Sequence, residues 1–301
     1  MTLPAVVRDA VTAAGLGAVV DARVAAGGDI STAWLVTCRD GATVVVKTFG
    51  RPDDGVTVPP PGLYGCEAEG LAALRTIGGV RTPDVLAVTG SAIVLERLAA
   101  APPDDDPAFW ARAGRCLAIM HGVLGPRYGW PADGWLGRLR QVNTWHDDGY
   151  EFFATRRLLR WLPEPAVAAA LDAADRAALE RICHRLPELL PPAPPSLTHG
   201  DLVRGNILTA DGRPALIDPS VSWMWPEVDL SMIYCVGQFS PPSRVPDRFF
   251  SAYAEISPLD DGWRERMPLL HLRELLSLLA HFGNDRWDMT GRIRQVLRAF
   301  G

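Results

Sequence analysis

The sequence lacks an excess of positive charge. Its 301 residues include 30 lysines and arginines against 35 aspartates and glutamates, which gives a formal net charge of -5. A general nucleic-acid-binding protein normally carries a basic face, so this balance argues against a nucleic-acid partner. Hydrophobic residues make up 48% of the chain and charged residues 22%, which is typical of an ordinary globular protein. An anionic ligand would therefore need cations placed locally beside it.

Cysteine pairs and long apolar runs are also missing. The five cysteines are scattered, odd in number and never spaced as Cys-x-x-Cys, so neither a disulfide framework nor a zinc site is indicated. No apolar run is long enough to span a bilayer, and charged residues interrupt the apolar N-terminal stretch, so we find no signal peptide. We expect a cytoplasmic protein with no membrane partner.

Lysine is almost absent, with a single example at Lys47. Every other lysine-or-arginine position holds arginine. A lysine in such a sequence suggests a task that a guanidinium does badly, such as placing a compact point charge against phosphate oxygens. The alternative is that Lys47 has no special task and results from drift in a lysine-poor sequence.

The N-terminal part is predicted to be rich in β-strands. Two β-prone runs, residues 33–37 and 43–49, flank the pair Asp40-Gly41, which is a strong signal for a β-hairpin. Lys47 then lies near the middle of the second strand. The other elements expected here are helices over residues 1–22 and 66–78 and strands over residues 85–88 and 92–95.

The remainder is predicted to be mostly helical. Helical patterns dominate from Phe109 onward, with a long helical region over residues 164–190. We therefore expect an α+β fold with two lobes. Residues 1–98 would form a small β-rich N-lobe, and residues 99–301 would form a larger, mostly helical C-lobe.

The strongest chemical signal is the segment HGDLVRGNILTADGRPALIDP, residues 199–219. Asp201 and Asn206 lie five residues apart in a loop, and the next residues form a β-hairpin that carries Asn206 before its first strand and Asp218 after its second. Two oxygen ligands thus lie at the same end of one rigid element, close to Asp201. Mg²⁺ prefers oxygen ligands and shares them with phosphates, and a carboxylate near a substrate hydroxyl can accept its proton.

The spacing in this segment is that of a phosphoryl-transfer site. The interval from Asp201 to Asn206 equals the interval between Asp and Asn in the catalytic loop of protein kinases, and Asp218 falls where the metal-binding Asp of their DFG segment is expected. The alternative is a polar hairpin whose Asp and Asn side chains only make turn and capping bonds.

A phosphate-binding end is expected near the first hairpin. Backbone amides at Gly27 and Gly28 would approach phosphate oxygens closely, and the hydroxyls of Ser31 and Thr32 would donate further bonds. Taken alone, a Gly-Gly pair is usually only a turn.

Lys47 also needs an acidic partner to hold its side chain. Glu67 and Glu69 both begin the next helix, and we favour Glu67 because it lies four residues before Leu71, which we place in the core. The alternative is that both glutamates only complement the N-terminus of that helix.

These residues, with several longer segments, resemble the fructosamine kinase family. That family lies within the aminoglycoside phosphotransferase and choline kinase-like superfamily, which has a protein-kinase-like fold. The segments that carry the resemblance are GPRYGW at 125–130, QVNTW at 141–145, EFFATRRL at 151–158, EVDLSM at 227–232, FFSAYAEISPLDDGWRER at 249–266 and HFG at 281–283.

The resemblance implies a reaction and its catalytic residues. It implies ATP- and Mg²⁺-dependent phosphorylation of a ketosamine, on a glycated amine or protein, at the sugar's 3-hydroxyl. Asp201 would be the catalytic base, and Asn206 and Asp218 would hold Mg²⁺.

The resemblance also implies the nucleotide contacts. Lys47 would contact the α- and β-phosphates, and Glu67 would brace it. Glu96 to Leu98 would form the hinge whose backbone receives adenine.

The sequence departs from the family pattern near the expected acceptor site. Val203-Arg204 replaces a Trp-Ser-like pair, Gly134 to Arg138 replaces an Asn-aromatic-Ile-Gly-Ser run, and Trp223 to Pro226 replaces a turn with Tyr, Gly and His. The metal and phosphate residues are intact. Tryptophans in these loops would either stack on the acceptor or fill the core.

Two other functions stay open. The first is a kinase for another hydroxylated acceptor, such as an aminoglycoside-like or specialised metabolite, for which an acidic pocket would be expected. The carboxylates available for such a pocket are Asp147, Asp148, Glu151 and Glu227. The second is a catalytically silent nucleotide-binding module, against which the retained Lys47, Asp201 and Asp218 argue.

Overall fold

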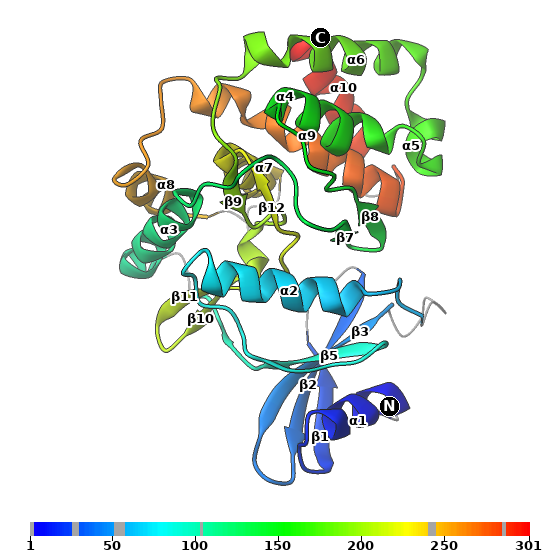
Figure 1. Cartoon of the computed structure of the whole chain (residues 1–301), viewed down its shortest axis with the longest axis vertical. Helices are drawn as coiled ribbons and strands as arrows, with labels where there is room; N and C mark the ends of the chain where they lie inside the picture. The colour runs from blue at the N-terminus through cyan, green and yellow to red at the C-terminus, as the bar shows by residue number, and fades with distance from the viewer. Residues whose placement is uncertain (1–2, 26–29, 51–57, 103–104, 240–244, 285–286) are drawn as a thin grey trace.

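Alternating side chains give the N-terminal part a five-stranded antiparallel sheet, in the order β1-β2-β3-β5-β4. A computed structural model describes residues 3–25, 30–50, 58–102, 105–239, 245–284 and 287–301. The sheet and two helices form one lobe and a mostly helical part forms the other, which confirms the expected α+β architecture (Figure 1). The N-lobe elements are α1 (Ala5–Ala13), β1 (Val19–Val24), β2 (Ser31–Cys38), β3 (Thr43–Phe49), α2 (Leu63–Thr76), β4 (Val85–Val88) and β5 (Ala92–Glu96).

The two faces of this sheet are covered by different helices. Trp34 of β2 and Val46 of β3 belong to the apolar cluster that contains Val7 and Val11 of α1. Lys47 follows Val46 and therefore faces the other side, toward α2 (Figure 1). The alternation that builds the core of this lobe thus also aims the lysine at α2.

The helix expected over residues 1–22 was wrong beyond its first half. α1 ends at Ala13, and Gly15 has a φ of 69°, which favours glycine and stops the helix. The valine-rich stretch that follows is β1, which pairs with β2 from Val19 opposite Cys38 to Val24 opposite Trp34. β-branched residues favour strands when a neighbouring strand offers hydrogen bonds.

The C-lobe contains most of the helices. The region expected to be helical over residues 164–190 is divided into α5 and α6, because Asp172 caps α6 through a reciprocal capping box with Asp175. The main C-lobe elements are α3 (Pro107–His121), β7 (Gly134–Leu136), β8 (Leu139–Gln141), α4 (Gly149–Phe152), α5 (Pro165–Ala170), α6 (Ala173–Leu189), β9 (Ser196–Thr198), β10 (Ile207–Ala210), β11 (Arg213–Leu216), β12 (Ser222–Met224), α7 (Pro226–Phe239), α8 (Asp247–Ala254), α9 (Trp263–Phe282) and α10 (Met289–Phe300).

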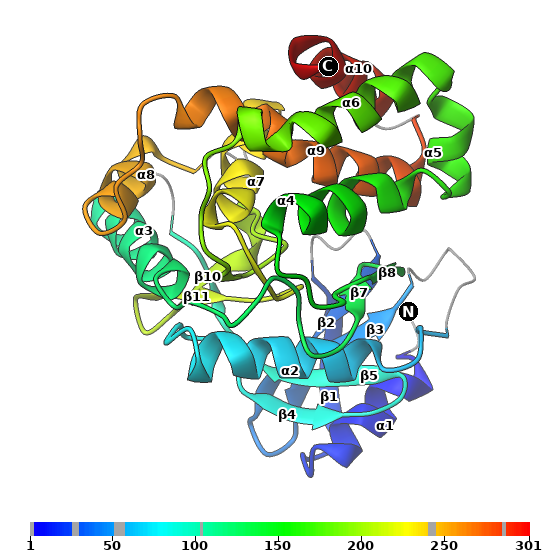
Figure 2. The same ribbon diagram turned by 45° about the horizontal axis from the view of Figure 1, so that its top comes forward.

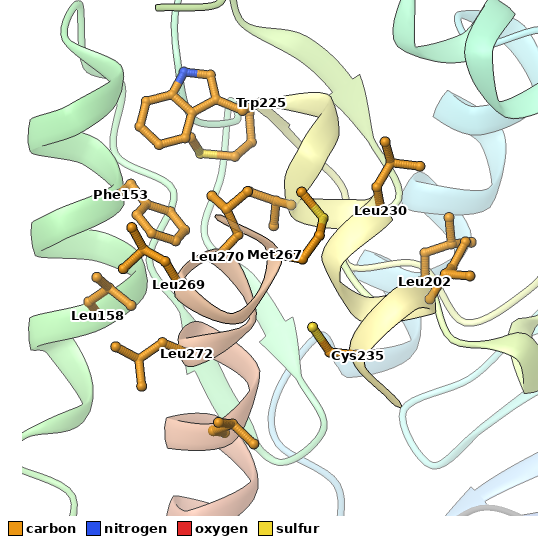
Figure 3. Packing of buried hydrophobic residues seen from close by; sticks show 14 of the residues in the cluster. Phe153, Leu158, Leu202, Trp225, Leu230, Cys235, Met267, Leu269, Leu270 and Leu272 are labelled. Atoms are coloured by element: carbon orange, nitrogen blue, oxygen red, sulfur yellow. The ribbon is translucent and has the colours of Figure 1, made fainter. Parts of the chain in front are cut away.

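The centre of the C-lobe is the leucine-rich helix α9. It packs against α5, α7 and α10 (Figure 2). Figure 3 shows Met267 and Leu270 of α9 between Phe153 on one side and Cys235 of α7 on the other. None of the described helices is both long and apolar enough to cross a bilayer.

A short strand, β6 (Ala99–Ala100), joins the two lobes. The chain leaves the N-lobe sheet after Glu96 and pairs through β6 with β10, whose other neighbour is β11. The hairpin β10–β11 therefore lies directly beside the connection between the lobes. We propose that the lobe boundary falls between residues 98 and 99, at this connection.

Candidate active site

Lys47 and Glu67 are placed by neighbouring elements of the N-lobe. The Nζ atom of Lys47 lies 2.7 Å from Oε1 of Glu67 on α2, and it also binds Oδ1 of Asp218 from the C-lobe. Burial lowers the pKa of Lys47, but the carboxylates of Asp218 and Glu67 outweigh burial and raise it overall. Lys47 is therefore a fixed positive charge, only 12% exposed, that ties the two lobes together.

A buried carboxylate of α7 holds the loop that carries Asp201. Asp229 is fully buried and accepts hydrogen bonds from the backbone amides of His199, at 2.6 Å, and Gly200, at 2.9 Å. Gly200 has a φ of 79°, and a Cβ atom there would lie 2.0 Å from the carbonyl oxygen of Ser220. Only glycine fits this position, so the loop conformation is built into the sequence.

His199 organises the same loop. Its Nδ1 accepts the amide hydrogen of Asp201 at 3.2 Å, so its Nε2 carries the proton and donates to the carbonyl of Ile217 at 2.9 Å. Burial lowers the pKa of His199, although Asp229 opposes this effect. The neutral imidazole thus links the Asp201 loop to the strand end that leads into Asp218.

Asp201 is a half-buried carboxyl with an unusual affinity for protons. Burial, and after it the nearby carboxylate of Glu274, raise its pKa to about 8, although Arg273 opposes both. The side-chain amide of Asn206 donates to the backbone carbonyl of Asp201 at 2.7 Å. A carboxyl with such a pKa can bind a hydroxyl proton near neutral pH.

Asn206 and Asp218 provide oxygen atoms on neighbouring segments. The side-chain nitrogen of Asn206 donates a hydrogen bond to the backbone carbonyl of Asp201, so the side-chain oxygen of Asn206 is left for another partner. The backbone carbonyl of Asn206 accepts the amide hydrogen of Ile217 at 3.1 Å, which holds the two segments side by side. Asp218 itself adopts a left-handed backbone conformation, with a φ of 58°.

This donor set fits Mg²⁺. Mg²⁺ usually binds one or two protein oxygens and completes its shell with phosphates and water. One amide oxygen and one carboxylate are such a set. Within the described ranges, no group of three or more His, Cys, Asp or Glu side chains could hold a metal ion.

The predicted phosphate end is only partly described. Gly27 and Gly28 lie outside the described residues. Ser31 is the first residue of β2, opposite Phe49. The hydroxyl of Thr32 is buried and donates to the carbonyl of Gly50 at 2.7 Å, so the expectation that it binds phosphate was wrong. This hydroxyl closes the end of the β2–β3 pair instead.

The predicted hinge residues flank the connection between the lobes. The backbone amide of Glu96 donates to the carbonyl of Asp84 at 2.8 Å, and its carboxylate pairs with Arg81. A role for Glu96 in binding adenine is therefore limited to its carbonyl oxygen. Leu98 follows two residues later, just before β6.

The carboxylates considered for an acidic pocket are mostly engaged elsewhere. Asp147 pairs with Arg127, Asp148 caps α4, and Glu227 pairs with Arg266 at 2.6 Å. Glu151 is exposed. These contacts give each of the first three a structural partner and leave little free negative charge among them.

The tryptophans after Asp218 fill the core. Trp225 is 5% exposed and packs against three aromatic rings, and Trp223 is 7% exposed and packs against Trp130. The three rings around Trp225 are those of Tyr128, Tyr150 and Phe153. Trp135 is only half-buried, and its backbone carbonyl accepts a hydrogen bond from Ser220.

Two charged residues beside the Asp201 loop were not predicted from the sequence. Arg273 and Glu274 are adjacent in α9, and both are buried, with 2% and 8% of their surface exposed. Arg273 donates to the carbonyl of Gly200 at 2.6 Å. Two adjacent charges within the leucine-rich run HLRELLSLLAHF were the available signal, because charged residues are rarely buried in a core without a role.

Comparisons with known proteins identify the family of the chain. The family model for fructosamine kinase matches residues 7–299. A probable ketoamine kinase from Thermus thermophilus is 33% identical over 259 residues, which cover 85% of this chain and 86% of that protein.

Two solved structures show the same fold. A candidate fructosamine-3-kinase from Thermobifida fusca is 30% identical, has a TM-score of 0.81 and covers 99% of this chain and all of its own. An aminoglycoside phosphotransferase in a ternary complex with AMP-PNP and hygromycin B has a TM-score of 0.64 at 17% identity, with coverage of 98% and 99%. The fold is therefore protein-kinase-like, and by the match of its family model along nearly the whole chain this protein belongs to the fructosamine kinase family.

Proposed function

We propose that this protein is an ATP-dependent kinase that phosphorylates the 3-hydroxyl of the sugar in ketosamines. The observation that carries the proposal is the ion-pair chain from Glu67 through Lys47 to Asp218, which meets the Asp201 loop where the lobes join. Membership of the fructosamine kinase family supports ATP as the phosphoryl donor. The ketoamine kinases among the relatives support the choice of acceptor.

In the proposed mechanism Asp201 binds the acceptor hydroxyl. The carboxylate accepts the hydroxyl proton while the oxygen attacks the γ-phosphorus and the bond to the leaving oxygen of ADP breaks. The raised pKa of Asp201 suits this transfer, because a base is most effective when its pKa lies near the working pH. Asp229 and His199 keep the loop in place during the reaction.

In this proposal, positive charges bind the phosphates of the nucleotide. Lys47 would place its ammonium against the α- and β-phosphates, with Glu67 fixing the position of Nζ. Asn206 and Asp218 would hold Mg²⁺, which neutralises charge on the phosphate oxygens. Adenine would contact the backbone at Glu96 and Leu98, and phosphates would approach the segment that includes Gly27, Gly28 and Ser31.

We base the proposed cellular location on the phosphoryl donor, ATP, and on the free state of the cysteines. All five cysteines are free thiols. Thiols stay reduced in the cytoplasm, where ATP is also available. We therefore propose a cytoplasmic enzyme that acts on small ketosamines or on glycated proteins.

The test is ATP consumption in the presence of Mg²⁺ with a panel of acceptors. The panel contains fructosyl-lysine, ribulosyl-lysine, the free sugars and several aminoglycosides. Turnover confined to the two ketosamines is the expected result. Turnover confined to an aminoglycoside would replace the proposed acceptor, and binding of ATP without turnover of any acceptor would indicate a silent module.

A further inference from the structure

Helix α9 carries two adjacent buried residues, Arg273 and Glu274, beside the loop that contains Asp201. Arg273 uses its two terminal nitrogens on other groups. One donates to the Gly200 carbonyl at 2.6 Å, and the other donates to Oε1 of Gln141 at 3.2 Å. Its guanidinium therefore fixes the backbone beside Asp201 and the end of β8.

The carboxylate oxygen Oε2 of Glu274 does not form a hydrogen bond with Arg273. This oxygen lies 3.7 Å from the nearest nitrogen of Arg273, which is too far for a hydrogen bond. The same oxygen is buried and has no hydrogen-bond partner among the residues that the structure describes. Burial raises the pKa of Glu274, and Arg273 opposes this rise without cancelling it. A buried carboxylate without a partner is costly, so its presence calls for an explanation.

Glu274 lies close to the reacting group. Among all neighbouring charges, its carboxylate has the largest effect on the pKa of Asp201. The nitrogen of Arg273 that is nearest to Glu274 also holds Gly200, the residue before Asp201. The carboxylates of Asp201 and Glu274 thus both interact with the charge of Arg273, although its hydrogen bonds go to Gly200 and Gln141. A buried carboxylate oxygen without a hydrogen-bond partner therefore lies near the loop that carries Asp201, where the acceptor hydroxyl would bind.

We propose that Glu274 binds the protonated amine of the ketosamine. This inference rests on the proposed function and names the group that recognises the nitrogen. In a ketosamine the amine is attached to C1 and the reacting hydroxyl to C3, so only C2 separates the two carbons. With the 3-hydroxyl on Asp201, the ammonium reaches a neighbouring carboxylate. The ammonium would give Glu274 a positively charged hydrogen-bond donor, which Arg273 does not provide.

The proposal makes Glu274 a specificity residue, because a neutral acceptor gains nothing from it. The variant Glu274→Gln keeps the shape of the side chain and removes its charge. Glu265→Gln is the matched control, since Glu265 is an exposed glutamate on the first turn of the same helix. The two acceptors are N-propyl fructosamine and the neutral ether in which oxygen replaces its nitrogen.

Equilibrium binding of both acceptors to the protein, loaded with Mg²⁺ and a non-hydrolysable ATP analogue, is measured together with kcat and KM. In Glu274→Gln the affinity for the amine should fall about ten- to a hundredfold, the usual effect of losing a hydrogen bond to a charged group. Affinity for the ether and for the ATP analogue should stay unchanged. Glu265→Gln should behave as the wild type for both acceptors.

Equal losses for amine and ether would assign Glu274 a purely structural role, and unchanged affinity for the amine would remove it from recognition. Either result overturns the inference while wild-type turnover of the ketosamine leaves the proposed function standing. Conversely, charge-dependent binding of the amine without turnover would support the inference and contradict the proposed function. Absence of amine binding by the wild type would contradict both.

Discussion

At the scale of the residue, the single lysine of the chain occupies a position with two carboxylates. Nζ of Lys47 contacts both Glu67 and Asp218 and is almost fully buried. A compact ammonium can donate to two carboxylates from different elements and still turn toward a phosphate. A guanidinium is larger and planar, so it cannot place its charge as a single point between Glu67 and Asp218.

The substitution Lys47→Arg tests this argument. We expect kcat/KM for ATP to fall by at least about a hundredfold, as is usual when a preorganised charge is displaced. Steady-state kinetics with varied ATP measures the effect, and circular dichroism checks that the fold is intact. Arg185→Lys, an exchange at an exposed ion pair on α6, is the control and should leave the kinetics unchanged. ATP kinetics like those of the wild type in Lys47→Arg would remove the need for lysine.

The candidate site residues that the sequence predicts are those whose signal is local. Asp201, Asn206 and Asp218 lie in one short segment, before and after the β10–β11 hairpin, so their spacing alone predicts that they lie together. Glu67 was distinguished from Glu69 by its position relative to Leu71 on one helix. Glu274 has no partner at a fixed spacing in the sequence, because its neighbour Arg273 contacts a residue 73 positions away in the chain. The two adjacent charges in a leucine-rich run mark the pair as unusual, but only the packing of α9 against the Asp201 loop shows where the pair lies.

At the scale of the element, α2 depends on a close approach to the segment after Asp218. A Cβ atom at Gly70 would lie 2.9 Å from Cγ of Pro219. The absence of a side chain lets α2 come near enough for Glu67 to reach Lys47. Gly65 on the same helix is different, since a Cβ atom there would meet nothing within 4 Å.

The pair of glycines gives a matched experiment. Gly70→Ala should push α2 away from Pro219 and lower kcat by about tenfold, because Glu67 then holds Lys47 less well. Gly65→Ala should leave kcat unchanged and add up to about 1 kcal/mol of stability through its better helix propensity. Turnover assays and chemical denaturation measure both variants. Equal kcat values for the two would contradict the proposed role of the close contact.

The elements that were predicted correctly carry their signals in short repeats. β2 and β3 are runs of β-branched and other apolar residues on either side of an Asp-Gly turn, which is a strong local signal for a hairpin. β1 was missed because its valines follow a helix after a short turn and its strand state depends on pairing with β2. The division between α5 and α6 depends on the cap at Asp172, whose effect is visible only once the helix start is known.

At the scale of the whole molecule, the ion pair between Lys47 and Asp218 joins the two lobes. Mg²⁺ and ATP would bind across the same junction, so their binding should stabilise the folded chain. We expect ATP with Mg²⁺ to raise Tm by several degrees and ATP with EDTA to raise it much less. In Asp218→Asn the difference between the two conditions should disappear. Differential scanning fluorimetry measures all four cases, and an equal shift with and without Mg²⁺ in the wild type would argue against a metal at this site.

Asp201 is proposed to activate the hydroxyl of a ketosamine for attack on ATP. The rate at which the phosphorylated ketosamine forms in the wild type and in Asp201→Asn, with binding of ATP measured in parallel, tests this role. We expect that the wild type forms the product, that Asp201→Asn loses at least about a hundredfold in kcat, and that ATP binding is nearly unchanged. Product formation by Asp201→Asn at the rate of the wild type would contradict it.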